Sequence, residues 1–145
     1  MALVRTKDTS PELVVRRILH AWGFRYRLHR KDLPGRPDIV LPRHRLIIDV
    51  RGCFWHSCPD CDRGRRRPKS NVEFWSRKLS ANVERDLRNT KALEERGWRV
   101  EIVWECQTKN TASLKVRLLG VLTTIRPTLS RKASEATRLP RLVAS

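Results

Sequence analysis

The chain has 145 residues, which is enough for one domain of ordinary size and too few for two. Its 32 Lys and Arg exceed its 15 Asp and Glu, so the net charge of +17 favours a polyanionic partner, nucleic acid above all. A hydrophobic content of 39% with five Trp argues against disorder, and no apolar run reaches the roughly 18 residues of a membrane span. The first residues also lack the apolar stretch of a signal peptide, so we expect a cytoplasmic protein without membrane contact.

The hydrophobic periodicity predicts a mixed series of helices and strands. In chain order these are a helix over residues 10–22, strands over 24–28, 38–41 and 46–50, a helix over 70–96, a strand over 98–104 and a helix over 112–122. Thr9 or Ser10 can cap the first helix, and Gly23 ends it. Ser70, with Glu73 three residues later, predicts a capping box at the start of the second helix.

Aromatic residues mark the expected core. Phe24, Tyr26 and Leu28 have the period of a half-buried strand, and the residues between and after them should form a basic outer face: Arg25, Arg27 and His29. Four of the five Trp lie on periodic elements, and we expect them in the core: Trp22, Trp75, Trp98 and Trp104.

The order of these elements favours a single-domain α/β fold in which helices flank one small mixed sheet. We expect this domain to span residues 1–126 and the basic residues 127–145 to form a mobile tail. The segment over residues 52–69 lacks periodicity, and it is too long to be an idle connection. We therefore expect this loop to have a function of its own.

Two aspartates stand at the facing ends of the two central strands. Asp38 opens one strand and Asp49 closes the next, so in a hairpin both carboxylates could meet the Val50 carbonyl around one Mg²⁺. Such a cation can activate water for phosphodiester hydrolysis. The spacing resembles the restriction-endonuclease-like PD-(D/E)xK fold, with Arg51 where that family usually has Lys. The alternative is two strand-end aspartates on a solvated edge of the sheet.

Four cysteines in a reducing compartment indicate a metal site rather than a disulfide framework. Three lie in the long loop and the fourth follows the last strand: Cys53, Cys58, Cys61 and Cys106. Four thiolates are the ligand set of a closed tetrahedral Zn²⁺ site, which would be structural and would hold the loop that also carries His56. The alternative is a set of buried cysteines without a metal.

Six short motifs are spread over the first 106 residues. They are Asp32-Leu33-Pro34-Gly35-Arg36-Pro37-Asp38, Gly52-Cys53-Phe54-Trp55-His56, Asn71-Val72-Glu73-Phe74-Trp75, Asn82-Val83-Glu84-Arg85-Asp86, Gly97-Trp98-Arg99-Val100 and Val103-Trp104-Glu105-Cys106. Together they closely resemble the very-short-patch repair (Vsr) endonucleases. The resemblance implies a Mg²⁺-dependent enzyme with a structural zinc. Such an enzyme nicks double-stranded DNA on the 5′ side of the T in a T·G mismatch that deamination of 5-methylcytosine leaves. It also implies contact with mismatch-repair proteins, and we expect a monomer.

The same resemblance assigns roles to single residues. It implies that Asp38 ligates Mg²⁺, that Val50 adds its backbone carbonyl, and that His56 acts at the scissile phosphate. We expect His56 to protonate the leaving oxygen as a general acid. Glu12 matches a helix glutamate that supports the catalytic histidine or a metal-bound water. The family's zinc ligands match the positions of the four cysteines.

Aromatic and basic residues of the long loop are expected to contact DNA. Phe54 and Trp55 match the family's aromatic pair that wedges into the base stack, and Met1 matches a further member of that wedge. Inserting apolar side chains costs stacking energy, and the cost is lower at a weakly stacked mismatch. A basic run is interpreted as an arm that contacts phosphates, or alternatively as a solvated face: Arg63, Arg65, Arg66, Arg67 and Lys69.

The sequence departs from the best-known family members around the predicted metal site. Arg51 stands where they have a His believed to act as the base, and a guanidinium cannot accept a proton. Asp49 adds a carboxylate that they lack. We therefore expect Asp49 to complete the metal site, Arg51 to neutralise phosphate charge and a metal-bound water to replace the histidine base. The chain also begins inside the family's motif, so we expect a shortened DNA-gripping arm.

Three functions remain open at this point. The first is a DNA mismatch nicking endonuclease of the Vsr type. The second is a less selective DNA nuclease of the same fold, linked to restriction or defence, which would also cut matched duplexes. The third is a zinc-stabilised DNA-binding module without activity, which Arg51 favours and which the retained acidic residues and His56 argue against.

Overall fold

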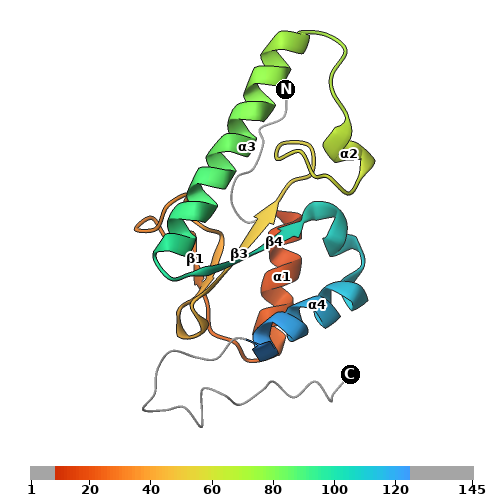
Figure 1. Cartoon of the computed structure of the whole chain (residues 1–145). Helices are drawn as coiled ribbons and strands as arrows, with labels where there is room; N and C mark the ends of the chain where they lie inside the picture. The colour runs from red at the N-terminus through yellow and green to blue at the C-terminus, as the bar shows by residue number, and fades with distance from the viewer. Residues whose placement is uncertain (1–8, 125–145) are drawn as a thin grey trace.

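The computed structural model describes residues 9–124, so Met1, the end of the expected domain at residue 126 and the tail over 127–145 lie outside the described range. Figure 1 shows the elements: α1 (Ser10–Ala21), β1 (Arg27–Leu28), β2 (Ile39–Leu41), η1 (Pro42–His44), β3 (Leu46–Arg51), α2 (Asp62–Arg65), α3 (Val72–Glu95), β4 (Arg99–Trp104), η2 (Glu105–Lys109) and α4 (Thr111–Thr124). The main helices and strands follow the predicted order. Within the described residues no helix is long and apolar enough to cross a membrane.

The strands form one mixed sheet in the order β1-β2-β3-β4. The pairs β1–β2 and β2–β3 are antiparallel, and β3–β4 is parallel. Within the β2–β3 hairpin, Ile39 is paired with Ile48 and Leu41 with Leu46. The parallel pair needs a crossover, which the chain makes through α2 and α3. The predicted small mixed sheet is thus confirmed.

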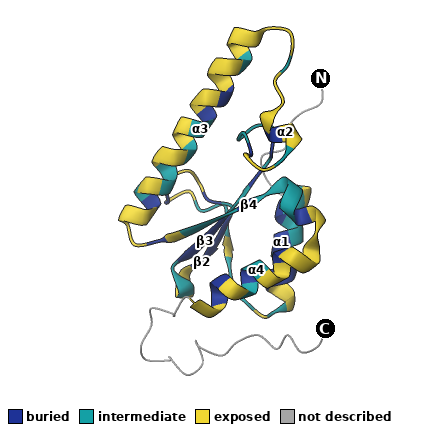
Figure 2. Cartoon of the chain, turned by 45° about the vertical axis from the view of Figure 1, so that its right-hand side comes forward, coloured by how far each residue is buried: buried dark blue, intermediate teal, exposed yellow. Residues whose placement is uncertain are grey.

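Helices cover both faces of this sheet, which explains why β2 and the first half of β3 are uninterrupted apolar runs. Figure 2 shows buried residues concentrated in the sheet and on the inner sides of α1 and α4. Ile39 and Ile48 pack with these two helices in the larger core cluster. Val40 and Ile47 point to the opposite face and pack with Leu93, near the C-terminal end of α3. Because α1 and α3 cover opposite faces of the sheet, residues of both helices can meet at the ends of β2 and β3.

The first helix is built as its sequence predicts. The hydroxyl of Thr9 accepts a hydrogen bond from the backbone N–H of Glu12 at 3.4 Å, which caps the helix. Gly23 follows the helix with φ +82°, a conformation that glycine adopts without strain. Val15 and Leu19 anchor the inner face of α1, which also carries Glu12 into the interior.

The long helix differs from its prediction in two respects. It begins at Val72, one residue too late for a Ser70 capping box, and its N-cap is Asn71 in the left-handed conformation without a side-chain cap. Asn tolerates this conformation better than most residues, so the chain can enter the helix through it. The first half of α3 also extends beyond the sheet (Figure 1), and Phe74 there is 59% exposed. Leu87, in the second half, is 65% exposed, so part of the predicted apolar face is not buried. Figure 2 shows most of this helix exposed.

The expectation of a tryptophan core is confirmed in part. Trp98 is buried in the smaller core cluster, and Trp22 packs against the larger one. The prediction is wrong for Trp75, which belongs to the projecting half of α3 and contacts loop aromatics instead. Trp104 is half-buried and lies beside the Arg51 guanidinium.

Candidate active site and metal centre

A cavity of about 830 Å³ opens where α1, the β2–β3 hairpin, the loop after β3 and α3 meet. Its walls include six ionisable side chains that could take part in chemistry: Glu12, His29, Asp38, Asp49, His56 and Asp86. Most of the predicted catalytic residues therefore line one cavity. His29 and Asp86 were not predicted to take part.

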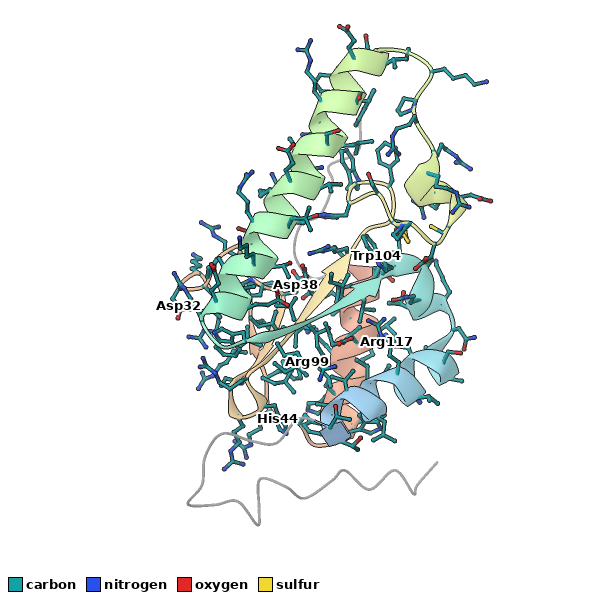
Figure 3. All side chains as sticks on the ribbon, viewed as in Figure 1. Asp32, Asp38, His44, Arg99, Trp104 and Arg117 are labelled. Atoms are coloured by element: carbon teal, nitrogen blue, oxygen red, sulfur yellow. The ribbon has the colours of Figure 1, made fainter. Side chains whose placement is uncertain are left out.

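Asp38 and Asp49 meet at the end of the β2–β3 hairpin, as predicted. Their strands are antiparallel with Ile39 paired to Ile48, which brings the two neighbouring aspartates together. The backbone N–H of Val50 donates to Asp38 Oδ2 at 3.0 Å. Burial and the negative charge of Asp49 raise the pKa of Asp38 to about 8. In the view of Figure 3, Asp38 lies between α3 and β3.

Glu12 and His29 complete a three-residue cluster with Asp38. The Nε2 atom of His29 lies 3.0 Å from Glu12 Oε2, and one possible ligand atom from each of the three residues lies within 4.8 Å of the others. Glu12 is only 1% exposed, and Arg16 contacts the same carboxylate oxygen at 3.3 Å. Two carboxylates and an imidazole are suitable ligands for a divalent cation. Asp49 and Val50 also line the cavity, on the β3 side of Asp38.

His29 was expected on the basic outer face of the first strand, and the structure corrects this. The strand pairing of β1 ends at Leu28, and His29 adopts φ +46°, in the left-handed region. This turn interrupts the strict alternation of a strand, so the imidazole reaches Glu12 rather than solvent. No sequence signal marks His29 as a left-handed residue.

A second histidine, His56, is held by α3. Its Nδ1 lies 2.6 Å from Asp86 Oδ2, and the imidazole donates to the carboxylate, which leaves Nε2 available to the cavity. Asn82, one helical turn earlier, donates to the backbone carbonyl of Trp55 at 2.9 Å. Both α3 residues therefore fix the loop over residues 52–56. In the sequence, the two residues bound the motif Asn82-Val83-Glu84-Arg85-Asp86, and their four-residue spacing places them on one face of the helix.

Arg51 contacts the site only through other residues. Its Nε donates to Asp49 Oδ2 at 3.0 Å, one terminal nitrogen donates to Thr90 Oγ1 at 3.3 Å, and the guanidinium lies 5.8 Å from the Trp104 ring centroid. The residue is 8% exposed and is not part of the cavity wall. Arg51 therefore orients the Asp49 carboxylate and ties the end of β3 to α3.

The four cysteines gather into one cluster beside the cavity. Their sulfur atoms all lie within 4.8 Å of one another, and none forms a disulfide. The backbone N–H of Cys106 donates to Cys53 Sγ at 3.3 Å. The N–H of Gly64 lowers the pKa of Cys61, whereas burial raises the pKa of Cys53 and Cys58. Four clustered thiols with N–H donors fit a structural Zn²⁺ site.

Gly64 is required by the conformation of this cysteine loop. A Cβ atom at this position would lie 2.0 Å from the carbonyl oxygen of Cys58, so a side chain cannot fit there. Gly64 lies in α2, the short helix within the segment that was expected to be an irregular loop. The backbone of α2 at Gly64 thus packs directly against the backbone of Cys58.

The predicted aromatic pair belongs to a larger aromatic cluster. The ring centroids of Phe54 and Trp55 lie 5.2 Å apart, and Trp75 of α3 lies 5.6 Å from Phe54 and 5.7 Å from Trp55. Phe74 extends the cluster and is exposed. The basic run is exposed on and after α2, namely Arg63, Arg65, Arg66, Arg67 and Lys69. Of these, Arg63 lines the cavity and pairs with Glu105.

Comparison with known proteins gives consistent matches. Residues 1–63 match the family model described as DNA mismatch endonuclease Vsr. Type II nicking enzyme V.XorIIP of Xanthomonas oryzae pv. oryzae is 50% identical over 122 residues, which cover 84% of this chain and 88% of that protein. Type II nicking enzyme V.NmeAIP of Neisseria meningitidis is 43% identical over 118 residues, 81% of this chain and 83% of the other. DNA mismatch endonuclease Vsr of Escherichia coli is 40% identical over 114 residues, 79% and 72% of the two chains.

Proposed function

The chain belongs to the Vsr family of DNA mismatch endonucleases, and we propose that it nicks duplex DNA on the 5′ side of the T in a T·G mismatch with the help of Mg²⁺. The observation that carries this proposal is the cavity where Asp38, Glu12 and His56 converge next to the aromatic cluster. This arrangement combines a cation site, a proton donor and a surface that can stack on bases. The net charge of +17 attracts the DNA backbone, and the mismatch makes the duplex easier to distort at the site.

The cation site rests on the chemistry of its donors. Asp38 and Glu12 offer carboxylate oxygens. Val50 lines the same cavity, and we propose its backbone carbonyl as a further ligand. When bound there, the cation supplies Lewis acidity for the attacking water and neutralises charge on the phosphoryl oxygens. Asp38 must lose its proton to serve as a ligand, because its raised pKa favours the neutral acid in the metal-free protein.

His56 has the geometry of a general acid. Asp86 accepts a hydrogen bond from the Nδ1–H of His56, so Nε2 is free to donate a proton to the oxygen that leaves phosphorus. The contact with the Asp86 carboxylate also fixes the orientation of the ring for this transfer. Asn82 keeps the Trp55 carbonyl in place, and with it the short loop on which His56 is mounted.

Asp49 and Arg51 act as a pair. Arg51 holds the Asp49 carboxylate against Asp38, where a second negative charge strengthens the attraction of a divalent cation. We propose that this carboxylate takes part in the cation site. Arg51 does not line the cavity, so we propose that it affects a bound phosphate only indirectly, by orienting the Asp49 carboxylate.

The aromatic cluster supports recognition of a mismatch. Phe54 and Trp55 line the cavity and contact each other edge to face, and Trp75 contacts both rings from α3. Rings that enter the base stack meet less resistance at a T·G pair than at a matched pair. The arginines after Cys61 are exposed, and we propose that they contact phosphates on the flanking backbone.

A nicking assay tests the proposal. Duplexes of one sequence, with either T·G or T·A at one position, are incubated with the zinc-containing protein in Mg²⁺ or in Mg²⁺-free buffer. We expect one nick 5′ to the T only in the T·G duplex with Mg²⁺. Equal cutting of both duplexes would favour the less selective nuclease, a reading to which the relatives named Type II nicking enzymes give weight. Binding without cutting would favour the inactive module.

A further inference from the structure

His29 occupies a conformation that its own residue type does not favour. Its φ of +46° lies in the left-handed region, which costs a residue with a Cβ of order 1 kcal/mol and is maintained only by surrounding structure. The backbone provides part of that structure, because the His29 N–H donates to the Asp38 carbonyl oxygen at 3.0 Å. The turn thus fixes His29 beside Asp38, which is the residue that precedes β2.

The imidazole of His29 is directed at a buried carboxylate. Its Nε2 lies 3.0 Å from Glu12 Oε2, and the side chain also lines the cavity. Glu12 lies on the inner face of α1, where a carboxylate is costly unless cations or donors surround it. Arg16 supplies one cation, with Nη1 at 3.3 Å from Glu12 Oε2. His29 lies beside the same oxygen, and Asp38 is the third member of the group.

The spacing of the three side chains fits one metal ion. Ligand atoms about 2.1 Å from a common ion are about 3 Å apart at right angles and about 4.2 Å apart across it. The donor atoms of Glu12, His29 and Asp38 already lie within 4.8 Å of one another. A cation among them would take the place of the proton that bridges His29 Nε2 and Glu12 Oε2.

We propose that His29 ligates the cation of the active site through Nε2, together with the carboxylates of Glu12 and Asp38. This inference rests on the proposed function only in that the cation is the one used for nicking. Imidazole nitrogen suits transition metals, whereas Mg²⁺ prefers oxygen ligands. The site should therefore bind Mn²⁺ more tightly than Mg²⁺, and His29 should account for the difference.

Electron spin-echo spectroscopy of bound Mn²⁺ tests the ligand directly. In the zinc-containing protein we expect ¹⁴N modulation from one imidazole, which changes to the ¹⁵N pattern when the protein is made with ¹⁵N-histidine. The four cysteine ligands proposed for zinc contribute no imidazole to this signal. Absence of Mn²⁺ binding, or Mn²⁺ bound without nitrogen coupling, would overturn the proposal, and this test needs no variant to fold.

Two matched variants assign the nitrogen. His29→Gln should abolish the modulation and weaken Mn²⁺ binding by about tenfold or more, with a smaller loss for Mg²⁺. His20→Gln is the control, because His20 is exposed at the far end of α1 and does not line the cavity. If His29→Gln keeps both the modulation and the Mn²⁺ affinity, His29 only balances the charge of Glu12 and the proposal is wrong.

The nicking assay separates this inference from the proposed function. Nitrogen-coupled Mn²⁺ in a protein that does not nick T·G duplexes would leave His29 as a ligand and refute the function. Nicking by a protein whose Mn²⁺ shows no nitrogen coupling would support the function and refute the role of His29.

Discussion

The Nδ1 atom of His56 lies 2.6 Å from Oδ2 of Asp86, so an imidazole on the loop after β3 is oriented by a carboxylate from α3. The two residues are 30 positions apart, and both line the same cavity. Their contact joins the proposed proton donor to the long helix. The same helix carries Trp75 of the aromatic cluster in its projecting half.

Removing the carboxylate from this pair should slow nicking. Asp86→Asn keeps the size of the side chain but no longer offers a carboxylate to the Nδ1–H of His56, and we expect a loss of about 10²-fold in the nicking rate. Glu84→Gln, an exposed change on the same helix, is the matched control and should retain the parent rate. Because the pair acts as a unit, Asp86→Asn combined with His56→Ala should be no slower than His56→Ala alone. Additive losses would mean that Asp86 acts independently of His56.

The raised pKa of Asp38 makes cation binding depend on pH. The pKa is about 8 in the folded protein against 3.8 for the ordinary group, so a cation must displace a proton from Asp38 below about pH 8. Mg²⁺ affinity should therefore increase by up to about tenfold per pH unit up to that value and then level off. Calorimetric Mg²⁺ titrations between pH 6 and 9 would measure this slope. An affinity independent of pH would show that Asp38 is already ionised.

The same shift gives the stability of the protein without Mg²⁺ a definite pH dependence. Because the folded-state pKa lies above the unfolded value, the contribution of Asp38 to stability is complete below about pH 4 and is lost as the pH rises towards 8. Asp38→Asn cannot ionise, so the gap between its free energy of unfolding and that of the parent should widen in its favour across this range. Parallel curves for the two proteins would contradict the expected shift.

Asp49 and Arg51 offer a test of the departure from better-known family members. Asp49→Ala should slow nicking by roughly 10²-fold or more, because the cation site loses a carboxylate. Arg51→Ala releases the Asp49 carboxylate and should also slow nicking, and Arg51→His should retain part of the activity. Since Arg51 acts through Asp49, the double alanine variant should be no slower than Asp49→Ala. Parent activity in Asp49→Ala would make Asp49 an ordinary strand-end residue.

Two glycines provide a matched pair for the zinc site. Gly64→Ala places a Cβ against the Cys58 carbonyl, whereas Gly120→Ala has no atom within 4 Å of the new methyl group. We expect close to one Zn²⁺ per chain in the parent and in Gly120→Ala, and a much lower content in Gly64→Ala. Because the zinc loop carries His56, Gly64→Ala should also lose nicking. Full zinc content in Gly64→Ala would contradict the proposed packing.

Local patterns made much of this fold predictable. The Asp38–Asp49 hairpin follows from two short apolar runs with a turn between them, and the four cysteines were identified by ligand type and spacing. His29 and Asp86 were missed because their roles depend on tertiary contacts. A left-handed turn redirects His29 to a helix 17 residues earlier, and Asp86 meets a loop 30 residues earlier. Trp75 was misplaced because periodicity does not reveal that α3 continues past the sheet.

The central claim is that Asp38 holds the cation with which this chain nicks a T·G mismatch. The most direct test compares single-turnover nicking rates of the parent and Asp38→Asn on T·G and T·A duplexes at saturating Mg²⁺. We predict rapid nicking 5′ to the mismatched T by the parent, little on the T·A duplex, and at least about a 10²-fold slower rate for Asp38→Asn. Equal rates on the two duplexes, or parent activity in Asp38→Asn, would contradict this account.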